Sequence, residues 1–155
     1  MMDISTYYFC SRISKGEADA TEYVDWAIEQ LVKGIETPSV KILASFMKPL
    51  YKPELEEYFY KSLDELGWGF PPFIENARIC VKYLAEKILD GSLEPIKGAH
   101  EIYTYVRDLN YPEDLIVWLE IDDYIDERVY NSIYQMRDEE LIERIIREAN
   151  RLRRL

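Results

Sequence analysis

The chain has 155 residues, enough for one domain with a substantial hydrophobic core. Apolar residues make up 48% of it and aromatic residues 14%, a composition that excludes a disordered chain. No run approaches the roughly 18 apolar residues of a membrane span. The net charge of −11 disfavours nucleic acid as a partner, because an acidic surface repels phosphate backbones.

Cysteine usage and the N-terminal sequence indicate a cytoplasmic protein, and its charge is unevenly distributed. Residues 137–155 carry six arginines and five acidic residues, whereas residues 1–136 carry 13 basic and 25 acidic side chains. Interleaved glutamates make the arginine-rich end a solvated face. The N-terminus has neither the basic start nor the apolar centre of a secretory signal. Cys10 and Cys80 form no zinc-binding pattern, so reduced thiols and no metal or cofactor are expected.

Three helices are expected in the first half of the chain, over about residues 20–33, 38–47 and 53–66, where glycine and proline separate periodic segments. The first has a wide apolar stripe formed by Tyr23, Val24, Ala27, Ile28, Leu31 and Val32. A stripe of that width predicts a buried face. Residues 1–18 show no clear period: Tyr7-Tyr8-Phe9 either starts a short helix or lies against the body, and Cys10 is a candidate exposed thiol.

The connector after residue 66 is rich in aromatic residues and proline. Trp68 and Phe70 are expected to fill a gap between the two halves; the alternative is an exposed recognition loop. Helices are then expected over about residues 72–90, 95–109 and 112–125. After a loop near residues 129–136, a last helix is expected over residues 138–152, with its apolar positions at helical spacing.

The chain contains one stretch twice. Residues 27–45 read AIEQLVKGIETPSVKILAS, and residues 84–102 read LAEKILDGSLEPIKGAHEI. Gly34 and Pro38 match Gly91 and Pro95 at a separation of 57 residues, an alignment that places Leu43 opposite His100. Glycine suits the left-handed end of a helix and proline suits the first turn, so the shared residues mark one helix ending and the next beginning.

The repeat predicts the architecture. Pro53-Glu54 matches Pro112-Glu113 at a separation of 59, which extends the copies to three helices each, about residues 23–66 and 80–125. We therefore expect a single all-α domain over residues 1–155 with about seven helices. The duplicated three-helix unit would stack as a short α-solenoid or an irregular bundle, with a C-terminal capping helix.

A resemblance supports the same architecture. The segments WAIEQLVKGIETPSVKILASF, ELGW, KILDGSLEPIKGAHEIY and LNYPEDL, within about residues 23–125, resemble a group of small bacterial all-helical proteins. The resemblance implies an immunity partner of a secreted bacterial toxin. It supplies no catalytic residues.

The acidic run Asp122-Asp123-Tyr124-Ile125-Asp126-Glu127 is the most chemically suggestive motif. Carboxylates on adjacent helical turns can hold Mg²⁺ against a diphosphate. That chemistry also needs a large cavity and a second metal motif, which the sequence lacks, so the run is interpreted as a solvated acidic face that meets a basic partner.

His100 is the only histidine, so any Ser-His-Asp or Cys-His mechanism would have to use it. Its place beside the inward positions Ala99 and Ile102 favours a structural or surface role. Gly98 and Ala99 are expected to permit close helix packing.

These features favour a non-enzymatic protein-interaction module that neutralises a basic toxin by covering its working surface. Asp122, Asp123, Asp126 and Glu127 are the expected acidic contacts, and Trp68 and Phe70 are candidate aromatic anchors. No nucleic-acid or membrane partner is expected; homo-oligomerisation through exposed tyrosines is a further possibility. The rival hypothesis is a small helical enzyme or ligand-binding protein with a carboxylate-lined site between helices.

Overall fold

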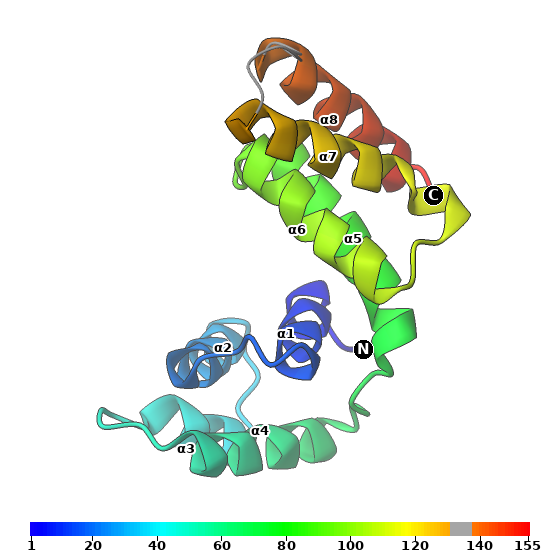
Figure 1. Cartoon of the computed structure of the whole chain (residues 1–155). Coiled ribbons are helices and arrows are strands. Elements are labelled where there is room, and N and C mark those ends of the chain that lie inside the picture. The colour runs from blue at the N-terminus through cyan, green and yellow to red at the C-terminus, as the bar shows by residue number, and fades with distance from the viewer. Residues whose placement is uncertain (131–137) are drawn as a thin grey trace. The chain divides into compact units, whose positions relative to one another are not determined.

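The computed structural model describes residues 1–130 and 138–155, and the described part is all-helical (Figure 1). Its helices are α1 (Ile4–Ser14), α2 (Ala20–Val32), α3 (Pro38–Ser45), α4 (Lys52–Leu66), α5 (Phe73–Leu89), α6 (Pro95–Asp108), the 3-10 helix η1 (Glu113–Leu115), α7 (Val117–Tyr130) and α8 (Asp138–Arg153). The predicted all-α class is confirmed. Most of the loop expected near residues 129–136 lies outside the described residues.

Helix α1 raises the number of described α-helices to eight, one more than expected. The Asp3 carboxylate accepts hydrogen bonds from the Thr6 N–H and the Thr6 hydroxyl, both at 2.8 Å. An aspartate three residues before a free N–H group is a favourable N-cap. The capping residue was therefore a better signal for this helix than apolar periodicity.

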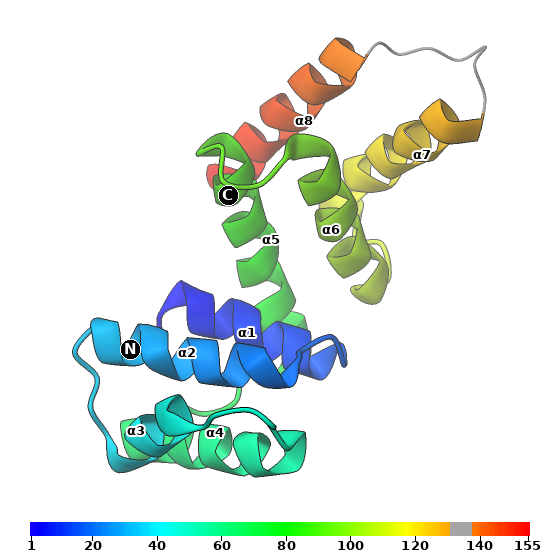
Figure 2. The same cartoon turned by 90° about the vertical axis from the view of Figure 1, so that its left-hand side faces the viewer.

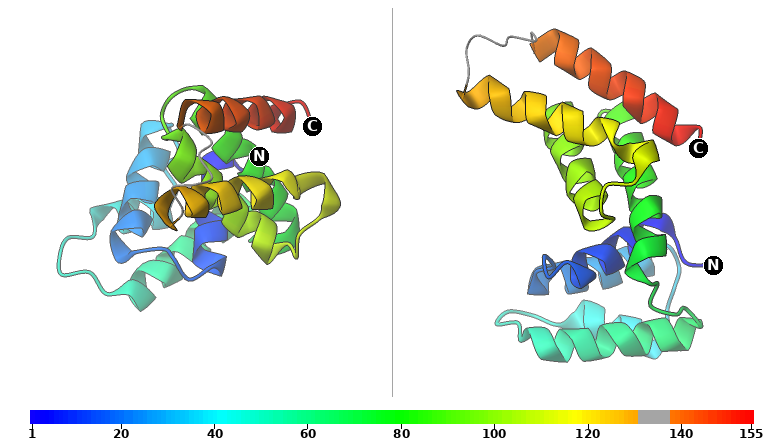
Figure 3. Two further views of the ribbon diagram at one scale, coloured as in Figure 1. Left: turned by 45° about the horizontal axis from the view of Figure 1, so that its top comes forward. Right: turned by 45° about the vertical axis from the view of Figure 1, so that its right-hand side comes forward.

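Contacts divide the chain into two compact units, Met1–Asn76 and Ala77–Leu155. Each unit contains one copy of the predicted three-helix repeat. In the first unit, α2 contacts α3 and α4, and α1 lies beside α2 (Figures 1 and 2). In the second unit, α6 contacts α7, and α8 contacts both of them (Figure 3). The expected single domain stays a prediction.

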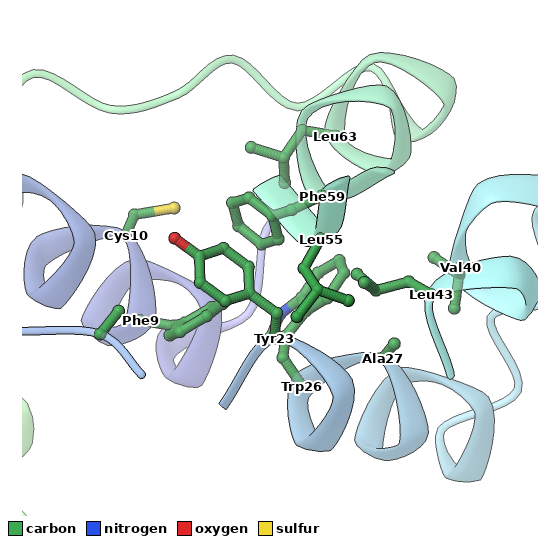
Figure 4. Packing of buried hydrophobic residues seen from close by; sticks show 11 residues of the cluster. Phe9, Cys10, Tyr23, Trp26, Ala27, Val40, Leu43, Leu55, Phe59 and Leu63 are labelled. Carbon is green, nitrogen blue, oxygen red and sulfur yellow. The ribbon is translucent and has the colours of Figure 1, made fainter. Parts of the chain in front are cut away.

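Aromatic rings form the centre of the first unit (Figure 4). The Phe9 ring meets Tyr23 edge-on at 5.0 Å and Phe59 at 5.2 Å, and the Trp26 ring meets Phe59 at 4.7 Å between centroids. Such edge-to-face pairs add to the stabilisation from burial alone. The Trp26 N–H also donates to the buried Thr6 hydroxyl at 2.9 Å, which fixes α2 against α1.

The buried face of α2 differs from the predicted stripe. Ile28 is exposed and Val32 is 84% exposed, whereas the polar Gln30 is fully buried. Trp26 decides this orientation, because its ring and N–H both bind inside the first unit. Cys10, the candidate exposed thiol, is also fully buried in this unit.

The second unit buries apolar side chains from α5 to α8, namely Ala77, Cys80, Val81, Leu84, Ala85, Ile88, Ala99, Ile102, Tyr105, Val106, Leu115, Trp118, Ile121, Leu141, Ile145, Ala149 and Leu152. Gly98 packs closely here, as expected. A Cβ atom at Gly98 would lie 2.6 Å from the Ile88 Cγ1 atom, so no other residue fits without displacement. The Gly98 edge of α6 therefore faces inward.

The two copies share their helix boundaries. Gly34 and Gly91 have φ angles of 89° and 83°, in the left-handed region, and Pro38 and Pro95 are the first residues of α3 and α6. These helix ends and helix starts are as predicted.

The inner faces of the copies follow a different register. The buried residues of α3 are Ser39, Val40 and Leu43, whereas α6 buries Gly98, Ala99 and Ile102, at a separation of 59. The helix boundaries thus match at a separation of 57 and the buried residues at 59, so Leu43 and His100 are aligned in sequence but only Leu43 is buried. By burial, His100 corresponds to Lys41, and both are exposed.

Candidate functional site

Helices α6 and α7 bring His100 and Asp122 together. Helix α6 begins at Pro95, and the Glu94 carboxylate caps it by accepting from the N–H groups of Ile96 and Lys97 at 3.0 and 2.8 Å. The His100 Nδ1 atom, in the second turn of α6, lies 2.7 Å from the Asp122 Oδ1 atom of α7. Residues 22 positions apart in sequence thus form one polar pair between neighbouring helices.

Burial is unequal within this pair. The Asp122 side chain is 7% exposed, whereas the His100 side chain is 58% exposed. An ionised carboxylate can only accept hydrogen bonds, so with Asp122 ionised the proton between the two residues is carried by Nδ1. In a neutral ring this is the tautomer whose Nε2 atom carries the lone pair.

The Asp122 carboxyl group titrates abnormally. Burial raises its pKa above the ordinary value, the hydrogen bond and charge of His100 partly offset that rise, and Asp126 and Asp123 add to it. Burial acts in this direction because it penalises the charged form. Burial thus disfavours the ionised form of Asp122, and the hydrogen bond with His100 offsets part of this effect.

The strained turn after α6 brings Tyr111 into contact with Tyr103 of α6. Asn110 and Tyr111 have φ angles of 62° and 55°, an unfavourable region for bulky residues. A hydrogen bond with Tyr111 raises the pKa of Tyr103, with burial and the charge of Asp122 contributing. The Tyr103 ring centroid lies 6.0 Å from that of His100. Strain of this kind concentrates at functional sites.

Helix α7 carries a second feature, which we call the acidic face: Glu120, Asp123, Tyr124 and Glu127. These four residues line a shallow depression of about 300 Å³. The depression borders a contact with α8. The Arg144 guanidinium lies 2.7 Å from the Glu120 carboxylate and 5.3 Å from the centre of the Tyr124 ring. One arginine is therefore already held there by a carboxylate and an aromatic ring together.

The predicted acidic contacts separate into two groups. Asp122 is buried against His100, whereas Asp123, Asp126 and Glu127 are exposed. Asp122 therefore does not belong to a solvated acidic face. Among residues 1–130 and 138–155, no group of three or more His, Cys, Asp or Glu side chains is arranged to hold a metal ion.

The two predicted aromatic anchors also differ. Trp68 is partly buried and packs against the core of the first unit. Phe70 is 36% exposed, and its ring lies 5.7 Å from the ring of Tyr60. Phe70 is thus the more accessible of the two.

The pairing of His100 with Asp122 was not predicted, although the sequence held a signal for it. Asp122 follows Trp118 by four residues and Ile121 by one, so it falls within the apolar stripe of α7. An acidic residue in such a stripe requires a partner, and the chain has a single histidine. The buried Gln30, whose amide nitrogen and oxygen have no hydrogen-bond partner among the described residues, was missed as well.

Comparison with known protein families, curated proteins and solved structures finds no match for this chain. No described helix is long and apolar enough to cross a membrane.

Proposed function

We propose that this chain is a non-enzymatic protein-interaction module that binds a basic partner on the acidic face of α7. In this proposal the chain is an immunity protein that acts in the cytoplasm and covers the working surface of a basic bacterial toxin. The excess of acidic residues over basic ones supports this choice of partner, because opposite charge accelerates encounter.

One observation carries the proposal. The chain's own Arg144 lies against Glu120 and Tyr124, at 2.7 Å from the carboxylate and 5.3 Å from the ring centre. A guanidinium gains from a carboxylate and from an aromatic face at once. The contact is thus an internal example of how this surface holds arginine.

The rest of the acidic face would hold further basic side chains. Asp123 and Glu127 lie four residues apart on α7 and form one exposed line of the helix. Both line the depression beside Tyr124. A partner that places arginines along this line would extend the pattern that Arg144 begins, and exposed Asp126 would add to the field.

A pull-down with the product of the adjacent gene, followed by a toxin-rescue assay, tests the proposal. We expect binding in the pull-down and rescue of growth. Absence of both binding and rescue would overturn the proposal.

Charge-neutralising variants test the surface itself. The double variant Asp123→Asn, Glu127→Gln is expected to weaken partner binding and to flatten its dependence on salt. The matched control is Glu36→Gln, Asp64→Asn, which removes the same charge from exposed positions of the first unit. Equal affinities of the two variants would remove the acidic face from the proposal.

Phe70 is proposed as an aromatic anchor for the same partner, since it is the more exposed of the two connector aromatics. The variant Phe70→Ala is expected to speed dissociation while leaving association nearly unchanged, because an anchor acts after encounter. Trp68 serves as the contrast: its replacement is expected to lower the stability of the first unit.

A further inference from the structure

The pair formed by His100 and Asp122 belongs to the second copy of the repeat, and the equivalent positions of the first copy hold different residues. By burial, Phe59, Ser62 and Leu63 of α4 match Trp118, Ile121 and Asp122 of α7, at a separation of 59. Leu63 belongs to the apolar core of the first unit. The second copy thus has a carboxylate at a position that an apolar side chain fills in the first.

The exposed member of the pair differs in chemistry as well. His100 corresponds by burial to Lys41, a side chain that is a cation under ordinary conditions. Imidazole instead has a nitrogen with a free lone pair in its neutral form. The second copy therefore combines a nucleophilic atom with a carboxylate, and the scaffold itself requires neither of them.

The geometry points to a phosphoryl-acceptor site: we propose that His100 accepts a phosphoryl group on Nε2 from a small acyl phosphate or phosphoramidate donor. Three observations support this. The Nδ1 atom lies 2.7 Å from an Asp122 carboxylate oxygen, and with that carboxylate ionised Nδ1 carries the proton and Nε2 of the neutral ring is the nucleophilic nitrogen. The side chain is 58% exposed, so a donor can reach the ring. The site lies on regular α6, which holds the ring in place.

The transfer balances with these groups alone. The Nε2 lone pair forms a bond to phosphorus as the bond from phosphorus to the leaving group breaks, and the leaving carboxylate or ammonia takes that electron pair. The ring becomes positively charged because Nδ1 keeps its proton. The Asp122 carboxylate, which accepts this Nδ1–H, offsets the new charge. The Asp122 carboxylate therefore stabilises the ring most strongly once the transfer has begun and the ring is positively charged.

Lys97 would supply a cation for the phosphoryl oxygens. It lies three residues before His100 on α6 and is exposed, and residues at this spacing share one helix face. The ammonium group of Lys97 would oppose the repulsion from the exposed carboxylates of α7. Asp122 is a positioning residue in this scheme, since it acts through the ring and does not meet the donor.

Incubation of the full chain with phosphoramidate, and separately with acetyl phosphate, tests the inference. The readouts are the mass gain of one phosphoryl group and the phosphorus NMR signal, which distinguishes the Nε2 isomer from the Nδ1 isomer. We expect Nε2 phosphorylation of His100, about tenfold or more faster than in the same chain unfolded in urea. The His100→Gln variant is expected to give no signal.

The variant Asp122→Asn separates a positioning role from a purely structural one. Asparagine can still accept the Nδ1–H bond but carries no charge, so we expect about a tenfold slower transfer with the folded structure retained by circular dichroism. Lys97→Met is expected to slow the reaction as well. Equal rates in the folded and urea-unfolded chain, or modification at Nδ1, would overturn the inference. It does not depend on the partner proposed for the acidic face, since Asp123 and Glu127 are not used in it.

Discussion

Removing His100 should destabilise the second unit, whereas removing Asp122 should not. The Asp122 carboxylate is 7% exposed, and its hydrogen bond to His100 spans 2.7 Å. In the variant His100→Ala this buried acceptor loses its donor. Leaving a buried polar group without a partner costs about 1–3 kcal/mol. Because half of the His100 side chain faces solvent, water can replace part of the bond, so we expect about 1 kcal/mol.

The opposite substitution removes the buried charge instead. Asp122→Leu places at this position the side chain that Leu63 supplies in the first unit. Replacing a buried ionic group by a well-packed apolar one is often neutral or stabilising by about 1–4 kcal/mol. His100 then becomes an exposed side chain that water hydrates. We therefore expect unchanged or higher stability for Asp122→Leu.

Hydrogen exchange of the amides in α6 and α7 measures these effects within the second unit, and urea unfolding of the full chain gives the total. The double variant His100→Lys, Asp122→Leu, which copies Lys41 and Leu63, serves as the control and should be at least as stable as the wild type. A larger loss of stability from Asp122→Leu than from His100→Ala would refute the reasoning.

The pH dependence of the same variants gives an independent check. Burial raises the folded-state pKa of Asp122, so the folded chain binds this proton more readily than the unfolded chain. Its contribution to stability is fully present below the unfolded pKa and is lost as pH rises through the folded pKa. The gain from Asp122→Leu should therefore be larger at neutral pH than in acid.

Three further predictions concern other residues. Gln30→Met should stabilise the first unit by about 1–2 kcal/mol in urea unfolding, because it removes a buried amide without partners. Asp3→Asn should lower stability by about 0.5–1 kcal/mol at neutral pH. Burial raises the pKa of Asp3, but hydrogen bonds from Ser5 and Thr6 outweigh it and lower the pKa, so this loss should vanish as pH falls through the folded pKa. Arg144→Ala should cost no more than about 1 kcal/mol in the same assay, since Glu120 is largely exposed. It should also tighten partner binding by calorimetry, because it frees Glu120.

The helix boundaries were predictable from single residues. Gly34 and Gly91 end helices because glycine adopts positive φ without a steric cost, and Pro38 and Pro95 begin helices because proline lacks an N–H group. These are local effects that any context preserves. Helix α1 was not among the seven expected helices because its apolar residues are spread around the helix, although Asp3 marks its start.

The buried faces were less predictable than the boundaries. On α2 the apolar residues occupy two neighbouring lines, and only tertiary contacts decide which line is buried. Trp26 binds Thr6 and Phe59, which turns Gln30 inward and Val32 outward. The register of α6 was likewise set by the close approach of Ile88 to Gly98. Periodicity within one helix contains no information about its neighbours.

The acidic run of α7 divides between two faces of the helix. Successive helical residues are rotated by about 100°. Asp122 therefore turns toward His100, whereas Asp123 and Glu127 form an exposed line beside Tyr124. Variants at 122 should change histidine chemistry without changing partner binding, and variants at 123 and 127 should do the reverse. A run that reads as one acidic patch in sequence is thus two separable features in the folded chain.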